Sequence, residues 1–277
     1  MVGRALRPVE AIRSEVSEIG ATDLHRRVPQ PATGDEIGRL AVTMNAMLDR
    51  IESGAVRQQR FVSDASHELR TPLAISRHML ETALRDPEST DWSTIAGDVL
   101  DEELRMQRLV DDLLWLARHD QHPHFLQHAL LDLDEVVMRQ AVRTPGRVGV
   151  ELDLSAVSAG QVRGSEDDLT RVVQNLLDNA LRHATSRVAV SLHSEPCGRV
   201  VLAVDDDGPG VPPEMRDMVF ERFSRADTAR GRDDGGSGLG LAIAQEIIAD
   251  HDGVLAVGAS GMGGARFSVE IHDARAD

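Results

Sequence analysis

The stretch EDDLTRVVQNLLDNALRHA, residues 166–184, decides the fold of the second half of the chain. Its apolar residues recur at intervals of three and four, which places them on one face of an α-helix. They are Leu169, Val172, Val173, Leu176, Leu177, Ala180 and Leu181. A complete apolar face of this kind predicts a helix that is packed into a core.

The same helix carries a second, polar stripe, roughly 140° from the first. It consists of Asn175, Asn179, Arg182 and His183. Amide oxygens and a guanidinium along one helical row suit a hydrated Mg²⁺ and phosphate oxygens. A solvated helix face accounts for the same residues, so the stripe alone leaves both interpretations open.

The flanking segments have the β-branched content and alternation of strands. They are residues 148–154, 187–194, 199–206, 253–260 and 265–272. A further helix is expected over 238–251. Short turns between the strands predict a mixed, largely antiparallel sheet with helices on one face, an α/β sandwich.

Two glycine-rich segments interrupt this pattern, DDDGPG at 205–210 and GGSGLGL at 235–241. Glycines at a strand end and a helix start let backbone amides approach a ligand, and a helix N-terminus favours anions. The Asp206 carboxylate can accept a hydrogen bond from the exocyclic amine of adenine. An ordinary turn explains an aspartate at this position equally well. The second segment lacks the glycine spacing of a dinucleotide site. The polar stretch between them, 220–237, is typical of a mobile lid.

The first half of the chain is rich in long helical patterns. Apolar seams recur at heptad-like spacing, with a breaker cluster, RDPESTD, at 85–91. The seams contain Leu40, Met44, Met47 and Ile51; Val62, Ala65, Leu69, Leu73, Leu80 and Leu84; and Ile95, Val99, Met106, Leu109, Leu113 and Leu116. A helical hairpin cannot bury both of its stripes alone, so dimerisation into a four-helix bundle is expected.

The segment FVSDASHELRTPL, residues 61–73, carries a histidine on the side opposite the seam. Thr71 follows His67 by one turn and shares its face. The Glu68 carboxylate can orient the imidazole or take its proton. Pro72 removes a helical hydrogen bond, which predicts a bend. A surface histidine is inert more often than not, so this geometry alone does not establish a site.

Composition narrows the function further. At roughly 100–200 residues per domain, 277 residues predict two or three domains. All 30 basic residues are Arg, which excludes P-loop and eukaryotic-type kinase sites because both need lysine. A net charge of −16 argues against nucleic acid as a partner.

The single cysteine, Cys197, and the lack of a long apolar run predict a cytoplasmic chain. The histidines of the stretch 116–128 are interpreted as incidental to a linker.

Five motifs in order resemble the cytoplasmic part of a bacterial two-component sensor histidine kinase. They are SHELRTPL, NLLDNALRHA, DDGPG, FERFSRAD and GGSGLGLAI. The N-terminal residues, with Pro8 and DEIGRL (35–40), resemble a HAMP signal relay. The resemblance implies a multi-domain α+β chain: HAMP over 1–54, a dimerisation and phosphoacceptor hairpin over 55–120, a linker over 121–130, and a Bergerat-type ATP-binding α/β sandwich over 131–277.

The resemblance also assigns roles. His67 is the phosphoacceptor, Glu68 its base and Thr71 the residue that positions water for phosphatase activity. Asn179 holds Mg²⁺ with support from Asn175. The other implied site residues are Arg182 and His183 near the phosphates, Asp206 at the adenine amine, Arg225 at the γ-phosphate, and Gly208, Gly210, Phe223, Gly236, Gly238, Gly240 and Leu241 around the nucleotide.

ATP and Mg²⁺ are the implied cofactors, and a second copy of the chain and a response-regulator receiver domain are the implied partners. Since MVGRALRP begins at a HAMP junction, an upstream transmembrane segment absent from this chain is expected to provide membrane contact. The complete protein would then lie at the cytoplasmic face of the bacterial membrane. The alternatives are a nucleotide-binding signalling adaptor without catalysis and a hydrolytic ATPase. Hydrolysis is disfavoured because Asn175 stands where related ATPases carry a glutamate base.

Overall fold

The computed structural model describes residues 7–20, 23–30, 36–119, 129–144, 147–224 and 237–275. The chain divides into two compact units, Met1–Thr71 and Pro72–Asp277. Each unit is described by itself.

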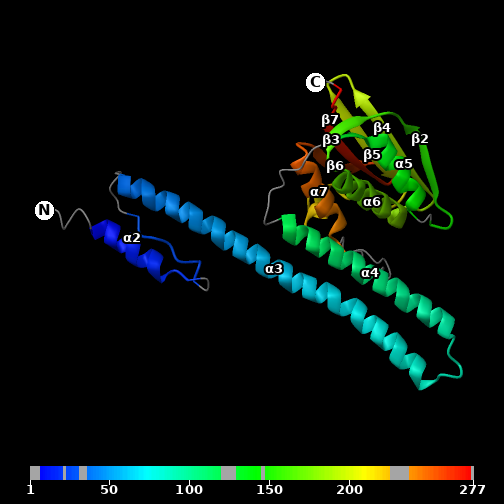
Figure 1. Cartoon of the computed structure of the whole chain (residues 1–277), viewed down its shortest axis with the longest axis horizontal. Helices are drawn as coiled ribbons and strands as arrows, with labels where there is room; N and C mark the ends of the chain where they lie inside the picture. Colours follow the sequence, from blue (N-terminus) through cyan, green and yellow to red (C-terminus); the bar gives the residue numbers. More distant parts are fainter. Residues whose placement is uncertain are drawn as a thin grey trace. The chain divides into compact units, whose positions relative to one another are not determined.

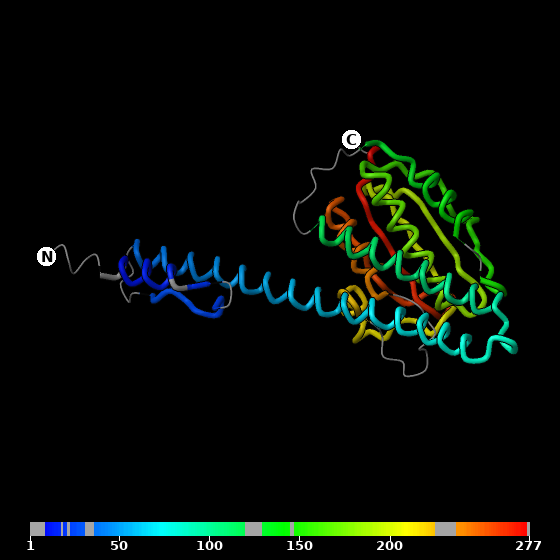
Figure 2. Tube along the Cα trace, turned by 60° about the horizontal axis from the view of Figure 1, so that its bottom comes forward, coloured from blue at the N-terminus to red at the C-terminus, as the bar shows by residue number. Residues whose placement is uncertain are grey.

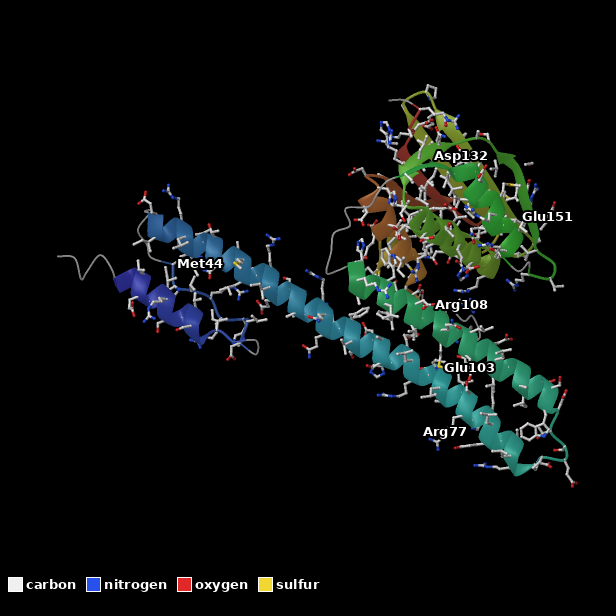
Figure 3. The ribbon with its side chains drawn as sticks, viewed as in Figure 1. Met44, Arg77, Glu103, Arg108, Asp132 and Glu151 are labelled. Atoms are coloured by element: carbon white, nitrogen blue, oxygen red, sulfur yellow. The ribbon has the colours of Figure 1, made fainter. Side chains whose placement is uncertain are left out.

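The first unit contains α2 (Arg7–Glu18) and the N-terminal part of α3 (Glu36–Arg85). Ile12, Val28 and Ala41 form a small buried cluster, against which Met44, labelled in Figure 3, also packs. The Asn45 side chain accepts a hydrogen bond from Val28 N at 2.9 Å and donates one to Val28 O at 3.1 Å. The segment between the two helices is therefore fastened to α3 by its backbone.

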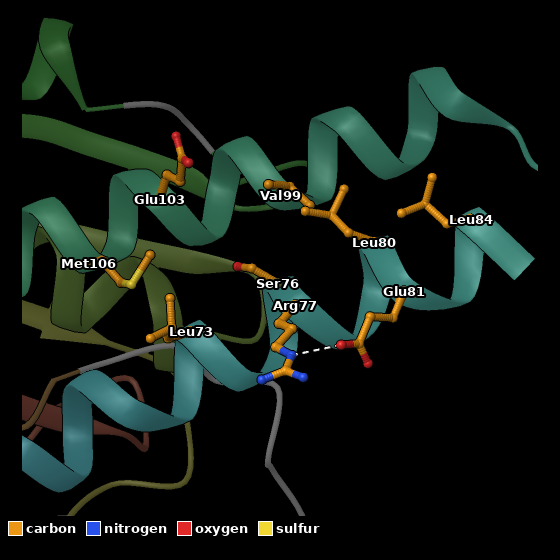
Figure 4. A pocket seen from close by; sticks show the side chains of 9 residues that line it. All are labelled: Leu73, Ser76, Arg77, Leu80, Glu81, Leu84, Val99, Glu103 and Met106. Atoms are coloured by element: carbon orange, nitrogen blue, oxygen red, sulfur yellow. Dashed lines mark hydrogen bonds and ion pairs between the residues drawn. The ribbon is translucent and has the colours of Figure 1, made fainter.

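The predicted helical hairpin consists of the C-terminal part of α3, which continues through Pro72 to Arg85, and α4 (Trp92–His119). Asp91 Oδ1 accepts hydrogen bonds from the amides of Ser93 and Thr94 and so caps α4. The apolar side chains between α3 and α4 line an open groove of about 320 Å³ (Figure 4). They are Leu73, Leu80, Leu84, Val99 and Met106.

The α/β part is built on a five-stranded sheet in the order β2-β4-β5-β7-β6. Only the β2–β4 pair of this sheet is parallel, and the other three pairs are antiparallel. The strands are β2 (Glu151–Val157), β4 (Arg187–Glu195), β5 (Arg199–Asp206), β6 (Val254–Ala259) and β7 (Ala265–His272). A separate antiparallel pair joins β1 (Ala129–Asp132) to β3 (Gln161–Gly164).

Helices α6 (Glu166–His183) and α7 (Gly240–Asp250) lie side by side on one face of this sheet (Figures 1 and 2). Helix α5 (Leu133–Arg143) packs against α6. Ser165 caps α6 by accepting a hydrogen bond from Asp168 N. All seven residues of the predicted apolar face of α6 are buried. The expected α/β sandwich is thereby confirmed. Two 3₁₀ helices, η1 (Pro213–Met215) and η2 (Met218–Phe220), follow β5.

The structure differs from the sequence-based expectation at several boundaries. Strand β2 begins at Glu151, because residues 148 and 149 form a turn. The sequence did not predict β1, α5 or β3. Strand β1 includes residues 129 and 130 of the expected linker, whose remaining residues, 121–128, lie outside the described ranges. None of the helices in the described part of the chain combines the length and apolar character that a membrane span requires.

Candidate active site

A buried carboxylate lies at the end of β5. Asp206 is 1% exposed, and its Oδ1 accepts hydrogen bonds from Gly208 N at 2.9 Å and Ala265 N at 3.2 Å. Among the described residues, Oδ1 of Asp206 accepts both of the hydrogen bonds that are donated to this side chain. The arrangement fixes the carboxylate and leaves Oδ2 as the oxygen that a ligand amine would meet.

Two glycines allow the backbone to approach this carboxylate and the end of α6. A Cβ on Gly208 would lie 2.3 Å from His183 O, so a larger residue there would displace the C-terminus of α6. A Cβ on Gly264, in the β6–β7 turn, would lie 2.3 Å from Asp206 Oδ1. The sequence analysis missed Gly264, because its partner is 58 positions away in the chain and the turn carries no motif of its own. Gly210 has a φ of +73°, which favours glycine.

Asp207, which follows β5, is bound to the turn between α6 and β4. Its carboxylate accepts hydrogen bonds from Thr185 N at 2.8 Å, Ser186 N at 3.0 Å and Ser186 Oγ at 2.6 Å. The Ser186 side chain, followed by the backbone amides of Ser186, Arg187 and Thr185, holds the pKa of Asp207 well below its usual range. The sequence analysis did not single out Asp207, whose partners lie 21 and 22 positions away in the chain.

Asn175 connects the polar stripe of α6 to the start of α7. Its Nδ2 donates a hydrogen bond to Gly240 O at 2.8 Å, and a Cβ on Gly240 would lie 3.1 Å from Asn175 Oδ1. Asn179, one turn later, is half-buried on the same stripe. Arg182 is also half-buried, whereas His183 is exposed at the end of the helix. The predicted row of polar side chains therefore begins at the second glycine segment.

Phe223 and the second glycine segment meet through their backbones. Phe223 N donates a hydrogen bond to Gly238 O at 2.9 Å. Both residues have positive φ, +61° for Phe223 and +69° for Gly238. Leu241 is half-buried in the first turn of α7. The predicted residues Arg225 and Gly236 lie outside the described residues.

The N-terminus of α7 has the properties of an anion site. Its N-cap residue, Leu239, provides no side-chain hydrogen bond to the helix. The amides of the first turn and the positive end of the helix dipole lie at this terminus. Backbone amides in this position can bind phosphate oxygens.

In the first unit, His67 is exposed on α3, and the half-buried Glu68 follows it. Thr71 Oγ1 donates a hydrogen bond to His67 O at 3.3 Å, as the spacing of one turn permits. The side chains of His67 and Thr71 are both exposed on this helix.

The part of the chain that the structure describes contains no group of three or more His, Cys, Asp or Glu residues able to hold a metal ion. Mg²⁺ prefers few protein ligands and retains waters, so a single amide oxygen with nucleotide phosphates is compatible with this donor set. Of the histidines in the 116–128 stretch, His119 stacks on Trp115, and His122, His124 and His128 are outside the described residues.

Three family models match consecutive parts of the chain. Residues 1–53 match the HAMP domain, residues 57–122 the His Kinase A (phospho-acceptor) domain, and residues 164–275 the histidine kinase-, DNA gyrase B- and HSP90-like ATPase. The chain belongs to the two-component sensor histidine kinases. Within this family, the ATPase match implies that residues 164–275 bind ATP.

Curated relatives and a solved structure agree with the family. The signal transduction histidine-protein kinase/phosphatase MprB of Mycobacterium leprae is 37% identical over 268 residues, 93% of this chain and 50% of the relative. Sensor protein CutS of Streptomyces coelicolor is 36% identical over 262 residues, 91% of this chain and 62% of the relative. The chain thus spans about half to three-fifths of these relatives. The histidine kinase AdeS of Acinetobacter baumannii has a TM-score of 0.59 at 25% identity, over 75% of this chain and 98% of that one.

Proposed function

We propose that this chain is the kinase part of a sensor histidine kinase that transfers the γ-phosphoryl group of ATP to His67 and then to an aspartate of a response-regulator receiver domain. The observation that carries the proposal is the fixed, buried carboxylate of Asp206 among glycine-dependent backbone contacts, a site suited to the adenine amine. His67 provides an exposed imidazole as acceptor.

The transfer balances as a displacement at phosphorus. A ring nitrogen of His67 attacks the γ-phosphorus, the bond to the β,γ-bridging oxygen breaks, and ADP leaves. The attacking nitrogen is the one without a proton, and Glu68 takes the proton carried by the other ring nitrogen. Phosphoryl transfer requires positioning and charge neutralisation more than covalent assistance, so arginine and backbone amides suffice without lysine.

The nucleotide-binding roles follow the geometry of α6 and α7. Asp206 would accept a hydrogen bond from the adenine amine, and the N-terminal amides of α7 would bind phosphate oxygens. Asn179, with Arg182 and His183 beyond it, would face the phosphate groups, and Arg225 would reach the γ-phosphate. Mg²⁺, when held by Asn179, would neutralise phosphate charge.

The side chain of Asn175 also argues against hydrolysis. Its amide is engaged with Gly240 at the start of α7, and an amide cannot act as a general base for water. Asn175 is therefore proposed as a positioning residue for the second glycine segment.

The position of Thr71 supports a second proposed activity, dephosphorylation of the response regulator. Its hydroxyl lies one helical turn from His67, where it can position water against a phosphorylated partner. We expect Thr71→Ala to autophosphorylate and transfer normally and to lose dephosphorylation of the response regulator, and Thr71→Ser to retain part of it.

The apolar groove between α3 and α4 supports a homodimer. Leu73 and Leu84 are largely exposed in the single chain, at the predicted seam of a four-helix bundle. For the complete protein, we propose an upstream transmembrane segment that holds the kinase part at the cytoplasmic face of the membrane.

Labelling with γ-labelled ATP and Mg²⁺ tests the function. The wild-type chain should acquire an acid-labile, alkali-stable label, and His67→Gln should acquire none. His78→Gln is the matched control, because His78 is also exposed on α3. Label that persists in His67→Gln, or its absence from a wild-type chain that binds ATP, would refute the assignment and favour a signalling adaptor.

A further inference from the structure

The last two turns of α4 dock on the α/β domain through polar contacts. Trp115 Nε1 donates a hydrogen bond to Asp168 Oδ1 at 3.2 Å, and the Arg171 guanidinium lies 5.8 Å from the centre of the Trp115 ring. His119 stacks on Trp115 and places its Nε2 3.4 Å from Asp250 Oδ2, at the end of α7. These polar contacts lie beside Leu116, which is 0% exposed, and contacts between domains of one chain are commonly reversible unless they are large and hydrophobic.

Asp112 lies at the other end of this contact, near the start of α7. Its carboxylate pairs with Arg171 Nη2 at 2.7 Å and accepts a hydrogen bond from Ser237 Oγ at 3.3 Å. The Asp112 side chain is only 15% exposed. Burial raises the pKa of this carboxyl, while the hydrogen bond and charge of Arg171 lower it.

Ser237 connects this carboxylate to the N-terminus of α7. Its Oγ accepts a hydrogen bond from Leu239 N at 3.3 Å and donates to Asp112 Oδ2. A relay of two hydrogen bonds therefore links the N-cap amide of α7 to an anionic side chain from α4. This is the helix end at which the proposed function places the phosphate groups.

The negative charge of the Asp112 carboxylate opposes the binding of nucleotide phosphates near the start of α7. An anion near a helix N-terminus is stabilised by the dipole, and a second anion at the same place is repelled by the first. The partly buried position of Asp112 reduces screening by salt. Asp112, which pairs with Arg171 and reaches the start of α7 through Ser237, would therefore oppose a triphosphate at the positive end of that helix.

We propose that Asp112 is an internal competitor of the nucleotide phosphates, which keeps the α/β domain docked on α4 until ATP binds. The inference rests on the proposed function, because that function supplies the triphosphate. Docking and triphosphate binding oppose each other, and linkage requires each to weaken the other by the same factor. ATP then both supplies the phosphoryl group and releases the domain that delivers it.

Nucleotide affinity in charge-neutral variants tests the competition. Asp112→Asn removes the charge at constant shape, and Asp111→Asn removes the same charge one residue earlier, at an exposed position of α4. With Mg²⁺, Asp112→Asn should bind a non-hydrolysable ATP analogue at least about fivefold more tightly than wild type. Adenosine, which has no phosphate, should bind both variants and wild type equally.

Trp115 gives a direct measure of docking. The chain has two tryptophans, and Trp92→Phe leaves Trp115 as the only one. In this background, the ATP analogue should increase acrylamide quenching of Trp115, and adenosine should not. An unchanged or decreased quenching on addition of the analogue would overturn the proposal.

The two proposals fail in different ways. If no variant binds adenosine or the ATP analogue, the proposed function is wrong, and with it the competition. If both ligands bind and Asp112→Asn has the affinity of Asp111→Asn, or a weaker affinity than wild type for the analogue, only the role of Asp112 is overturned.

Discussion

Helix α6 and the α3–α4 hairpin use apolar residues in opposite ways. In α6, the residues at three- and four-residue spacing are all buried by the same chain. In the hairpin, Leu73 and Leu84 of the α3 seam are more than half exposed, although Leu109 and Leu116 of the α4 seam are buried. The α/β domain thus has a core of its own, whereas the α3 side of the hairpin presents apolar side chains that the described residues leave largely exposed.

Under the proposed function, this difference assigns nucleotide binding to the α/β domain and changes of packing to the hairpin. A domain with its own core can hold Asp206 and the first glycine segment in fixed positions independently of the packing of the hairpin. A hairpin that completes its core with a second copy can change its packing without unfolding the nucleotide site. The following substitutions test this division, from the largest expected effect to the smallest.

Leu176→Ala should have the largest effect on the α/β domain. Leu176 is 0% exposed, and its truncation leaves a cavity beneath the sheet that costs about 2–5 kcal/mol. Val142→Ala, on α5 at 84% exposure, is the control and should change stability by no more than about 0.5 kcal/mol. Urea unfolding followed by circular dichroism measures both, and equal losses would contradict the assignment of the core.

The double variant Leu80→Glu with Leu84→Glu should separate the dimer and spare the α/β domain. Burying a leucine contributes about 1.5–3 kcal/mol, so placing charges at both positions should weaken association by well over tenfold, at about 1.4 kcal/mol per factor of ten. Sedimentation equilibrium measures the association, with His78→Glu as a control on the same helix. A double variant that remains dimeric would move the dimer seam elsewhere.

Gly264→Ala should weaken nucleotide binding with a smaller effect on stability. The added Cβ would collide with Asp206 Oδ1, and relief of such overpacking costs about 1–3 kcal/mol. Gly258→Ala, in the neighbouring strand β6, adds the same group where nothing lies within 4 Å. Calorimetric titration with an ATP analogue should detect weakened binding only for Gly264→Ala.

The smallest effect is expected from the pH dependence of Asp207. Its pKa is lowered in the folded state, so the ionised group stabilises the fold above its ordinary value near 4, and this contribution is lost as the pH falls through the folded value. The stability difference between wild type and Asp207→Asn should be constant from about pH 7 to 5 and decrease at about pH 4 and below. Ser186→Ala, which removes the main hydrogen bond to Asp207, should reduce this decrease. A difference independent of pH would contradict the role of the charge.

Much of the fold could be predicted because its signals are local. The period of the apolar residues in α6 and the alternation in β4, β5 and β7 lie within single segments. Strands β1 and β3 have four residues each, too few for a period to stand out. Their pairing depends on residues about 30 positions apart in the chain.

The residues of the candidate site also fall into two groups, those that the sequence predicts and those that only the tertiary structure brings together. Motif order placed Asp206, Asn179 and the two glycine segments along the chain, and the sequence by itself determined which residue types were available for nucleotide chemistry. Tertiary structure alone decided that Gly264 faces Asp206, that Asp207 binds the turn between α6 and β4, and that Asp112 contacts Ser237 just before α7. The physical reason is that periodicity and turn chemistry act between near neighbours in the chain, whereas steric exclusion and hydrogen bonding act between whatever groups the packed helices and strands bring within a few ångströms.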